Sequence, residues 1–176
     1  MTSRMAFTLA KMNDWRIKFD VEQDISEVRA IVDSQIVERG EPKVFFRAAV
    51  TRLSICIRDL VAKSQILAKK KISFTDDVII EAPVNDVSSL VKFMRNAMCH
   101  VDTDLHLLDA GVYFSMEIVR GKATSHQMSG RSFGSDYADD VAFLIGPQRI
   151  YYRRHLIRAF DEAVANLESH FRDNLC

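Results

Sequence analysis

The chain has few cysteines, no excess of either charge and no long hydrophobic run. Its three cysteines, Cys56, Cys99 and Cys176, are an odd number without paired spacing, which argues against a disulfide framework. Lysine plus arginine equals aspartate plus glutamate at 24 each. The net charge therefore gives no general affinity for nucleic acid, and any such binding needs a local patch of positive charge.

The apolar stretch nearest the start of the chain, Met5 to Ala10, is interrupted at Lys11. It is too short for a transmembrane span and is a poor secretory signal. We therefore expect a cytoplasmic protein.

A length of 176 residues is typical of one domain, and no internal repeat divides the chain. We expect a single domain over 1–176, with residues 1–18 as a candidate for a loosely ordered N-terminal segment. Apolar residues spaced three and four apart predict four helices, over 21–38, 43 to about 70, 86 to about 101 and 150 to about 172. Asn85 or Asp86 is expected to cap the third helix.

Two short segments between the third and fourth helices, "GVYFSMEIV" and "VAFLI", are rich in β-branched and aromatic residues, which is typical of strands. The polar segment 120–140 between them contains three glycines and reads as a mobile loop. The predicted fold is mainly α: a bundle of four principal helices with a short β-hairpin inserted before the last helix.

The stretch "RNAMCH" on the predicted third helix places Arg95, Asn96 and His100 beside an apolar face. On a regular helix Arg95 and His100 point about 140° apart, so one straight helix cannot direct both at one small group. Either the helix ends before His100, or two copies of the helix supply the two side chains.

This motif resembles that of the HEPN domain, in which an arginine, often followed by asparagine, precedes a histidine by four to six residues on the third helix of a small bundle. The resemblance implies a metal-independent endoribonuclease, typically a toxin or defence protein, without a cofactor. It also implies a homodimer whose active cleft lies at the interface. A two-fold axis would then place two copies of the helix side by side and line one cleft with both copies of Arg95, Asn96 and His100.

The residue types fit this chemistry. Histidine, with an ordinary pKa of about 6.5, can accept the proton of a ribose 2′-hydroxyl near neutral pH. The guanidinium of Arg95 can stabilise the negative charge that gathers on the phosphate oxygens. Asn96 can orient the imidazole or the phosphate, since it lies one turn before His100.

One position departs from the family pattern. Some HEPN toxins carry a tyrosine two residues after the histidine, which a nucleotidyltransferase antitoxin modifies, and this chain has Asp102 there. Silencing of that type is therefore not expected, although an antitoxin or regulator of another type stays open. The alternative function is a catalytically silent HEPN-like bundle that binds RNA, nucleotide or a protein partner, and a third is a purely structural or interaction protein.

Two other parts of the sequence carry residue types that occur in binding sites. Cys99, His100, Asp102, Asp104 and His106 are metal-ligand types, but they have no familiar zinc spacing, and we predict no metal site. The segment "GPQRIYYRRHLIR" gives a basic patch with interleaved tyrosines, a pattern that suits RNA binding, or else a solvated face whose arginines pair with nearby carboxylates. The predicted RNA-binding residues are Arg149, Arg153, Arg154 and Arg158.

Overall fold

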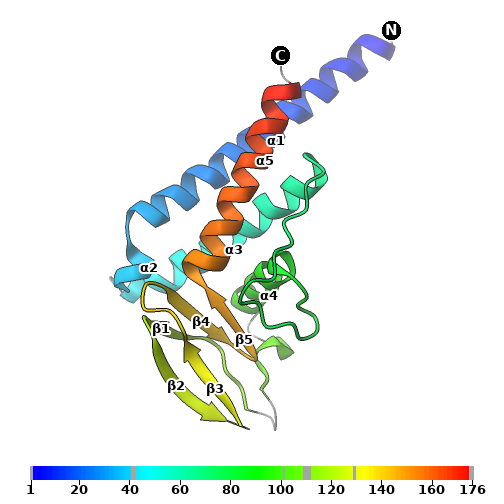
Figure 1. Cartoon of the computed structure of the whole chain (residues 1–176). Helices are drawn as coiled ribbons and strands as arrows, with labels where there is room; N and C mark the ends of the chain where they lie inside the picture. Colours follow the sequence, from blue (N-terminus) through cyan, green and yellow to red (C-terminus); the bar gives the residue numbers. More distant parts are fainter. Residues whose placement is uncertain (1, 41–42, 101, 109–111, 129, 175–176) are drawn as a thin grey trace.

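The computed structural model describes residues 2–40, 43–100, 102–108, 112–128 and 130–174. Long helices form one end of the molecule and antiparallel strands form the other (Figure 1). In chain order the elements are α1 (Thr2–Asp33), α2 (Ile36–Arg39), α3 (Lys43–Ile66), α4 (Val87–Cys99), the 3-10 turn η1 (Asp104–His106), β1 (Glu117–Arg120), β2 (Ala123–Met128), β3 (Arg131–Ser135), β4 (Val141–Ile145), β5 (Gln148–Tyr151), the π-helical turn η3 (Tyr152–Ile157) and α5 (Arg158–Asn174).

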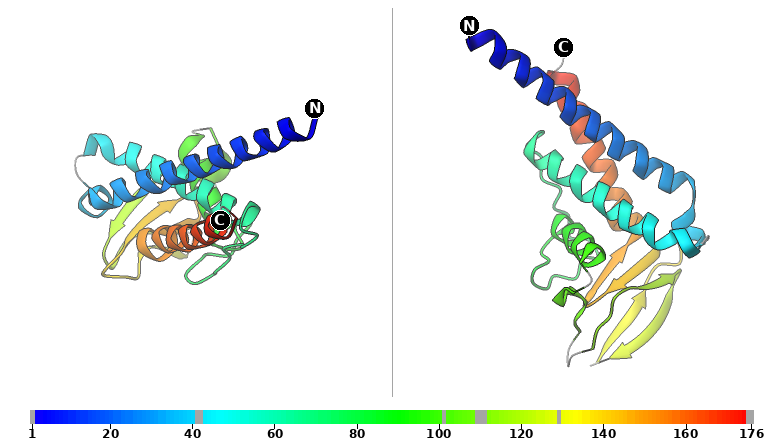
Figure 2. Two further views of the ribbon diagram at one scale, coloured as in Figure 1. Left: turned by 90° about the horizontal axis from the view of Figure 1, so that it is seen from above. Right: turned by 180° about the vertical axis from the view of Figure 1, so that it is seen from behind.

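The central helix is α3, because α1, α4 and α5 all pack against it. Its side chains Leu53, Ile57 and Leu60 are fully buried, as the spacing of apolar residues predicts. Helix α1 runs across α3 and extends beyond the other helices, as the two views of Figure 2 show. The stretch 2–18, which the sequence suggests is loosely ordered, belongs to this helix.

Helix α4 begins at a strong N-terminal cap. The carboxylate of Asp86 accepts a hydrogen bond from the backbone N–H of Ser89 (2.8 Å), and the Ser89 hydroxyl accepts one from the backbone N–H of Asp86 (3.0 Å). Lys71 forms an ion pair with the same carboxylate (2.7 Å). Burial acts to raise the pKa of Asp86, but the hydrogen bonds from Lys71 and Ser89 outweigh it and hold that pKa below its ordinary value. The capped end fixes where α4 starts and so where its last turn lies.

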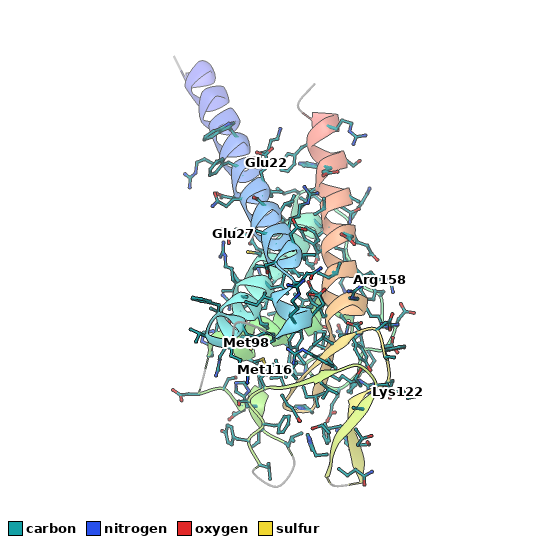
Figure 3. The ribbon with its side chains drawn as sticks, turned by 90° about the vertical axis from the view of Figure 1, so that its left-hand side faces the viewer. Glu22, Glu27, Met98, Met116, Lys122 and Arg158 are labelled. Carbon is teal, nitrogen blue, oxygen red and sulfur yellow. The ribbon has the colours of Figure 1, made fainter. Side chains whose placement is uncertain are left out.

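The strands form a three-stranded antiparallel sheet in the order β1-β4-β5 and a separate two-stranded hairpin of β2 and β3. Strand β4 is buried on both faces, with Val141, Phe143 and Ile145 in the helical core. Its Ala142 and Leu144 pack in a second apolar cluster on the opposite face. Met98 of α4 and Met116 lie where the helices meet the strands (Figure 3).

The prediction of a mainly α bundle with one hairpin is wrong: the fold is mixed α/β, and the described residues form five strands in two antiparallel sheets. The segment 120–140, predicted to be a loop, forms the β2–β3 hairpin. Its outward residues are polar, so it lacks the apolar alternation that marks a strand. Across the hairpin, the aromatic ring of Phe133 stacks on the imidazole of His126, with ring centres 4.6 Å apart.

The last helix also begins later than predicted. Residues 148–151 form β5, which pairs with β4, and a π-helical turn over Tyr152–Ile157 precedes α5. Within the residues that the structure describes, no helix is both long enough and apolar enough to cross a membrane.

Candidate functional site

The last turn of α4 carries the motif residues. Arg95 and Asn96 are half-buried on this helix, and the Arg95 guanidinium donates a hydrogen bond to the Asn96 side-chain oxygen (3.0 Å). Cys99, the last residue of α4, and His100, directly after it, are exposed. The four side chains therefore gather at one end of one helix, within reach of solvent.

His100 is the residue at which α4 ends. Its backbone is extended (φ −122°, ψ 103°), while its N–H still donates to the Asn96 carbonyl (3.0 Å). The sequence left two arrangements open, a helix that ends before His100 or two copies of the helix that supply the two side chains. In the structure the helix ends before His100. Because His100 has left the helical path, the angle of about 140° expected on a regular helix does not set the direction of its side chain.

The turn η1 braces this end of α4. His106 is buried, and its Nε2 lies 3.0 Å from the Ala97 carbonyl oxygen, one of the carbonyls left without a partner at a helix end. Because a carbonyl can only accept, Nε2 carries the proton. The chain then continues to Phe114, whose N–H donates to the His106 carbonyl (2.7 Å). His106 is therefore a structural residue, and it holds the segment that follows His100.

Arg95 also borders a charged groove of about 600 Å³ between α1, α3 and α4. Four acidic and three further basic side chains line it: Asp20, Asp24, Glu27, Asp59, Arg52, Arg58 and Lys63. Lys63 links two of the carboxylates, at 2.5 Å from Asp59 and 3.8 Å from Asp24. Arg58 and Asp59, neighbours on α3, both line this groove, and Asp59 forms its ion pair with Lys63.

Asp24, which lines this groove, and Cys56, a buried residue of α3 close to Glu27, both have raised pKa values. Burial, followed by a hydrogen bond with Asp59, raises the pKa of Asp24. Burial, followed by the charge of Asp24, raises the pKa of the Cys56 thiol to about 12. Since the thiolate is the reactive form, Cys56 is an inert core residue at neutral pH.

The four arginines predicted to bind RNA all pair with carboxylates. The pairs are Arg149–Asp136 (2.7 Å), Arg153–Glu38 (3.5 Å), Arg154–Asp139 and Arg154–Asp140 (3.0 Å each), Arg158–Asp76 (2.9 Å) and Arg158–Glu162 (3.2 Å). Tyr151 and Tyr152, the aromatic residues of this segment, are buried. This geometry favours the solvated-face interpretation, while RNA binding by these arginines stays a prediction.

His155, from the same segment, is fully buried and structural. Its Nδ1 accepts a hydrogen bond from the backbone N–H of Tyr151 (3.0 Å), so its Nε2 must carry the proton that points to the Asp76 carbonyl oxygen (3.0 Å). Burial lowers the pKa of this histidine. The neutral imidazole thus connects the end of β5 to the loop after α3.

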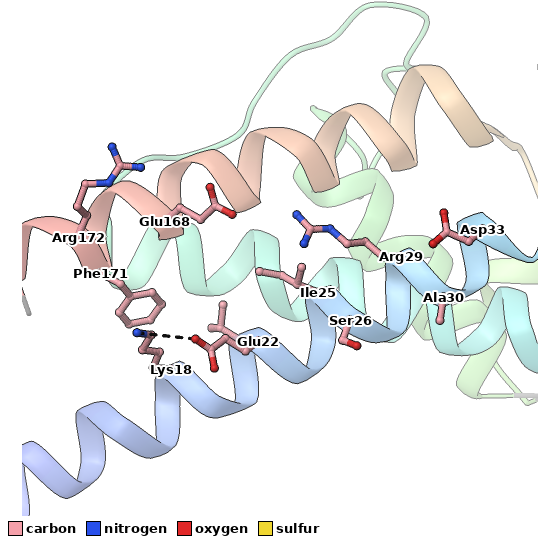
Figure 4. Close-up of a pocket in the computed structure, with 11 residues that line it drawn as sticks. Lys18, Glu22, Ile25, Ser26, Arg29, Ala30, Asp33, Glu168, Phe171 and Arg172 are labelled. Atoms are coloured by element: carbon pink, nitrogen blue, oxygen red, sulfur yellow. Dashed lines mark ion pairs between the residues drawn. The ribbon is translucent and has the colours of Figure 1, made fainter.

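A second hollow, of about 750 Å³, lies between α1 and α5 (Figure 4). Lys18 and Glu22 on α1 form an ion pair there (3.7 Å), and Glu168 and Phe171 face them from α5. No residue of the 95–100 stretch lines this hollow. Within the described parts of the chain, no three His, Cys, Asp or Glu side chains lie close enough together to hold a metal ion.

Sequence reasoning missed one cation beside the motif, Lys92. It lies one turn before Arg95 on the solvent side of α4, and its side chain is exposed. The sequence does indicate that Lys92 and Arg95 share one face of the helix, because Ser88, Lys92, Arg95 and Cys99 are spaced four, three and four apart.

Comparison with known proteins gives no match: no protein-family model, no curated protein and no solved structure resembles this chain.

Proposed function

We propose that this protein is a metal-independent endoribonuclease of the HEPN type, acting as a toxin or defence protein. One observation carries the proposal: Arg95, Asn96 and His100 gather at the exposed end of α4, where the helix stops and frees the histidine. A guanidinium and an imidazole are the two groups that cleavage of RNA by its own 2′-hydroxyl uses when both reach the same phosphate.

In the proposed step, His100 accepts the proton of the 2′-hydroxyl and the 2′-oxygen forms a bond to phosphorus. The bond from phosphorus to the 5′-oxygen breaks, and the leaving oxygen takes a proton from water. Arg95 donates hydrogen bonds to the non-bridging oxygens, whose negative charge grows in the transition state. The products are a 2′,3′-cyclic phosphate and a 5′-hydroxyl, and the step needs no metal ion.

We further propose that the protein is a homodimer with its cleft at the interface. Large apolar side chains lie exposed on the segment after the motif, which supports this: Leu107 is 39% exposed and Tyr113 60%. These two residues pair with each other in an isolated antiparallel bridge, so they present one apolar surface near the end of α4. Exposed apolar patches of this kind are typical of protein interfaces.

The rival proposal is a catalytically silent protein that binds RNA without cutting it. The hydrogen bond between Arg95 and Asn96 favours it, because it directs the guanidinium along its own helix. The rival predicts that wild-type protein binds RNA and leaves it intact.

Mixing two inactive variants tests the proposed nuclease and its shared cleft together. Arg95→Ala and His100→Ala proteins should each be inactive alone. After subunit exchange, about half of the dimers are mixed, and each keeps one intact pair of arginine and histidine across the interface. The mixture should therefore regain up to about a quarter of the wild-type cleavage rate. No gain in a mixture shown to contain mixed dimers would contradict action across the interface.

A further inference from the structure

A small polar groove lies between α3 and the first two turns of α4, on the N-terminal side of the motif. Its volume is about 240 Å³, and its charged and amide side chains are Arg58, Lys71, Asp86, Lys92, Gln65 and Asn85. Arg58 lines both this groove and the charged groove that Arg95 borders. The two grooves are therefore adjacent, and Arg58 stands where they meet.

The charges of the small groove do not cancel. Its one carboxylate, Asp86, is already engaged by Lys71 (2.7 Å) and by the backbone N–H of Ser89 at the start of α4 (2.8 Å). Arg58 and Lys92 have no ion pair within the described residues. Lys92 and Arg95 are neighbours on α4, about 4.5 Å apart along its axis.

We propose that this groove binds the phosphate backbone of single-stranded RNA on one side of the bond that is cut, with Arg58 and Lys92 as the contacting cations and Lys92 about 12 Å along the α4 axis from His100. This proposal rests on the proposed nuclease function, since it assumes that the RNA bound in the groove is the strand that is cleaved at His100. Backbone binding needs mobile cations at the surface, and these two can meet a phosphate without first losing a carboxylate partner. Gln65 and Asn85 add donors and acceptors that can meet sugar or base edges.

The predicted patch over 149–158 is the poorer surface for the same ligand. Arg153 and Arg158 hold carboxylates, so a phosphate must displace Glu38 or Asp76 before it can bind. The carboxylates also repel the approaching backbone. Removing two positive charges from the small groove should therefore weaken RNA binding more than removing two positive charges from the patch over 149–158.

The experiment measures binding of a fluorescent single-stranded oligonucleotide by anisotropy. Its 2′-positions carry O-methyl groups, so it cannot be cut and binding is separated from cleavage. The double variant Arg58→Ala/Lys92→Ala should bind about tenfold more weakly than wild type. Over about 50–200 mM salt, the slope of log affinity against log salt should fall by about 0.7 for each lost phosphate contact.

The comparison variant is Arg153→Ala/Arg158→Ala, which removes the same charge from the 149–158 patch; the groove assignment expects it to lose less affinity than the Arg58/Lys92 variant, and an equal or larger loss would overturn that assignment. Circular dichroism and thermal melting must show that both variants fold. Wild-type affinity in the Arg58/Lys92 variant of a chain that cuts RNA would overturn the groove assignment and leave the nuclease proposal standing. A wild-type chain that neither binds nor cuts RNA would overturn both. Competition by free nucleotide as strong as by the oligonucleotide would contradict a site for an extended strand.

Discussion

His100→Ala should lower the rate of RNA cleavage by about 10²–10⁴-fold, the usual contribution of a general acid or base. The side chain is exposed, and only the backbone N–H of this residue contributes to the end of α4, through its hydrogen bond to Asn96. The substitution should therefore leave the fold unchanged. The rate is measured under single-turnover conditions on a defined single-stranded RNA, with a melting curve for each protein.

Cys99→Ser is the matched control for this prediction. Cys99 is exposed directly before His100, so it tests whether disturbing this surface is enough to stop cleavage. A serine there should leave the cleavage rate near that of wild type. Equal losses from both substitutions would indicate that the surface, and not the imidazole, matters, while full activity in His100→Ala would remove the histidine from the mechanism.

His155→Ala should lower the free energy of unfolding by at least about 3 kcal/mol. The substitution leaves a cavity beside the fully buried Tyr151 and removes the partners of two backbone groups, the Tyr151 N–H and the Asp76 carbonyl. Cavities of this size and unpaired buried groups each cost about 1–3 kcal/mol. Urea unfolding measures the loss, and His100→Ala, at an exposed histidine, should stay within about 0.5 kcal/mol of wild type.

The same histidine should make stability depend on pH. Burial lowers the pKa of His155 in the folded protein, while in the unfolded chain it keeps its ordinary pKa of about 6.5. Below that pH the unfolded chain binds the extra proton, so its contribution to stability is full above about pH 6.5 and is lost as the pH falls toward the folded value. The difference in unfolding free energy between wild type and His155→Ala should therefore shrink on acidification. A constant difference from neutral pH to about pH 5 would contradict a neutral buried imidazole.

An apolar face with the helical period predicted α3, α4, α5 and the part of α1 from residue 21, but neither residues 2–20 of α1 nor the separate helix α2. Leu53, Ile57 and Leu60 mark α3, and Asp86 marks the start of α4. The hairpin could not be predicted, since its strands carry residues such as Ser125 and Gln127 where alternating apolar residues would reveal a strand. Strand β5 could not be predicted because it has only four residues and because its pairing with β4 is a tertiary contact that the local sequence does not encode.

The candidate site shows the same division. A local spacing was enough to place Arg95, Asn96 and His100 within six residues at the end of one helix, while their joint role in catalysis stays a prediction. Ion pairs between segments far apart in the sequence could not be predicted. Arg158, for example, pairs with Asp76, which lies 82 positions earlier in the chain. The charge of a segment alone therefore did not reveal which arginines were already paired and which cations, such as Lys92, remained at the surface.

Mapping the ends of cleaved RNA tests the central claim most directly. Purified protein is incubated with single-stranded RNA in the presence of EDTA, with His100→Ala in parallel. A 2′-hydroxyl nucleophile activated by His100 predicts fragments that end in 2′,3′-cyclic phosphate and begin with 5′-hydroxyl, from the wild-type protein alone. Intact RNA, cleavage that appears only when divalent metal is restored, or fragments with 3′-hydroxyl ends would contradict the claim.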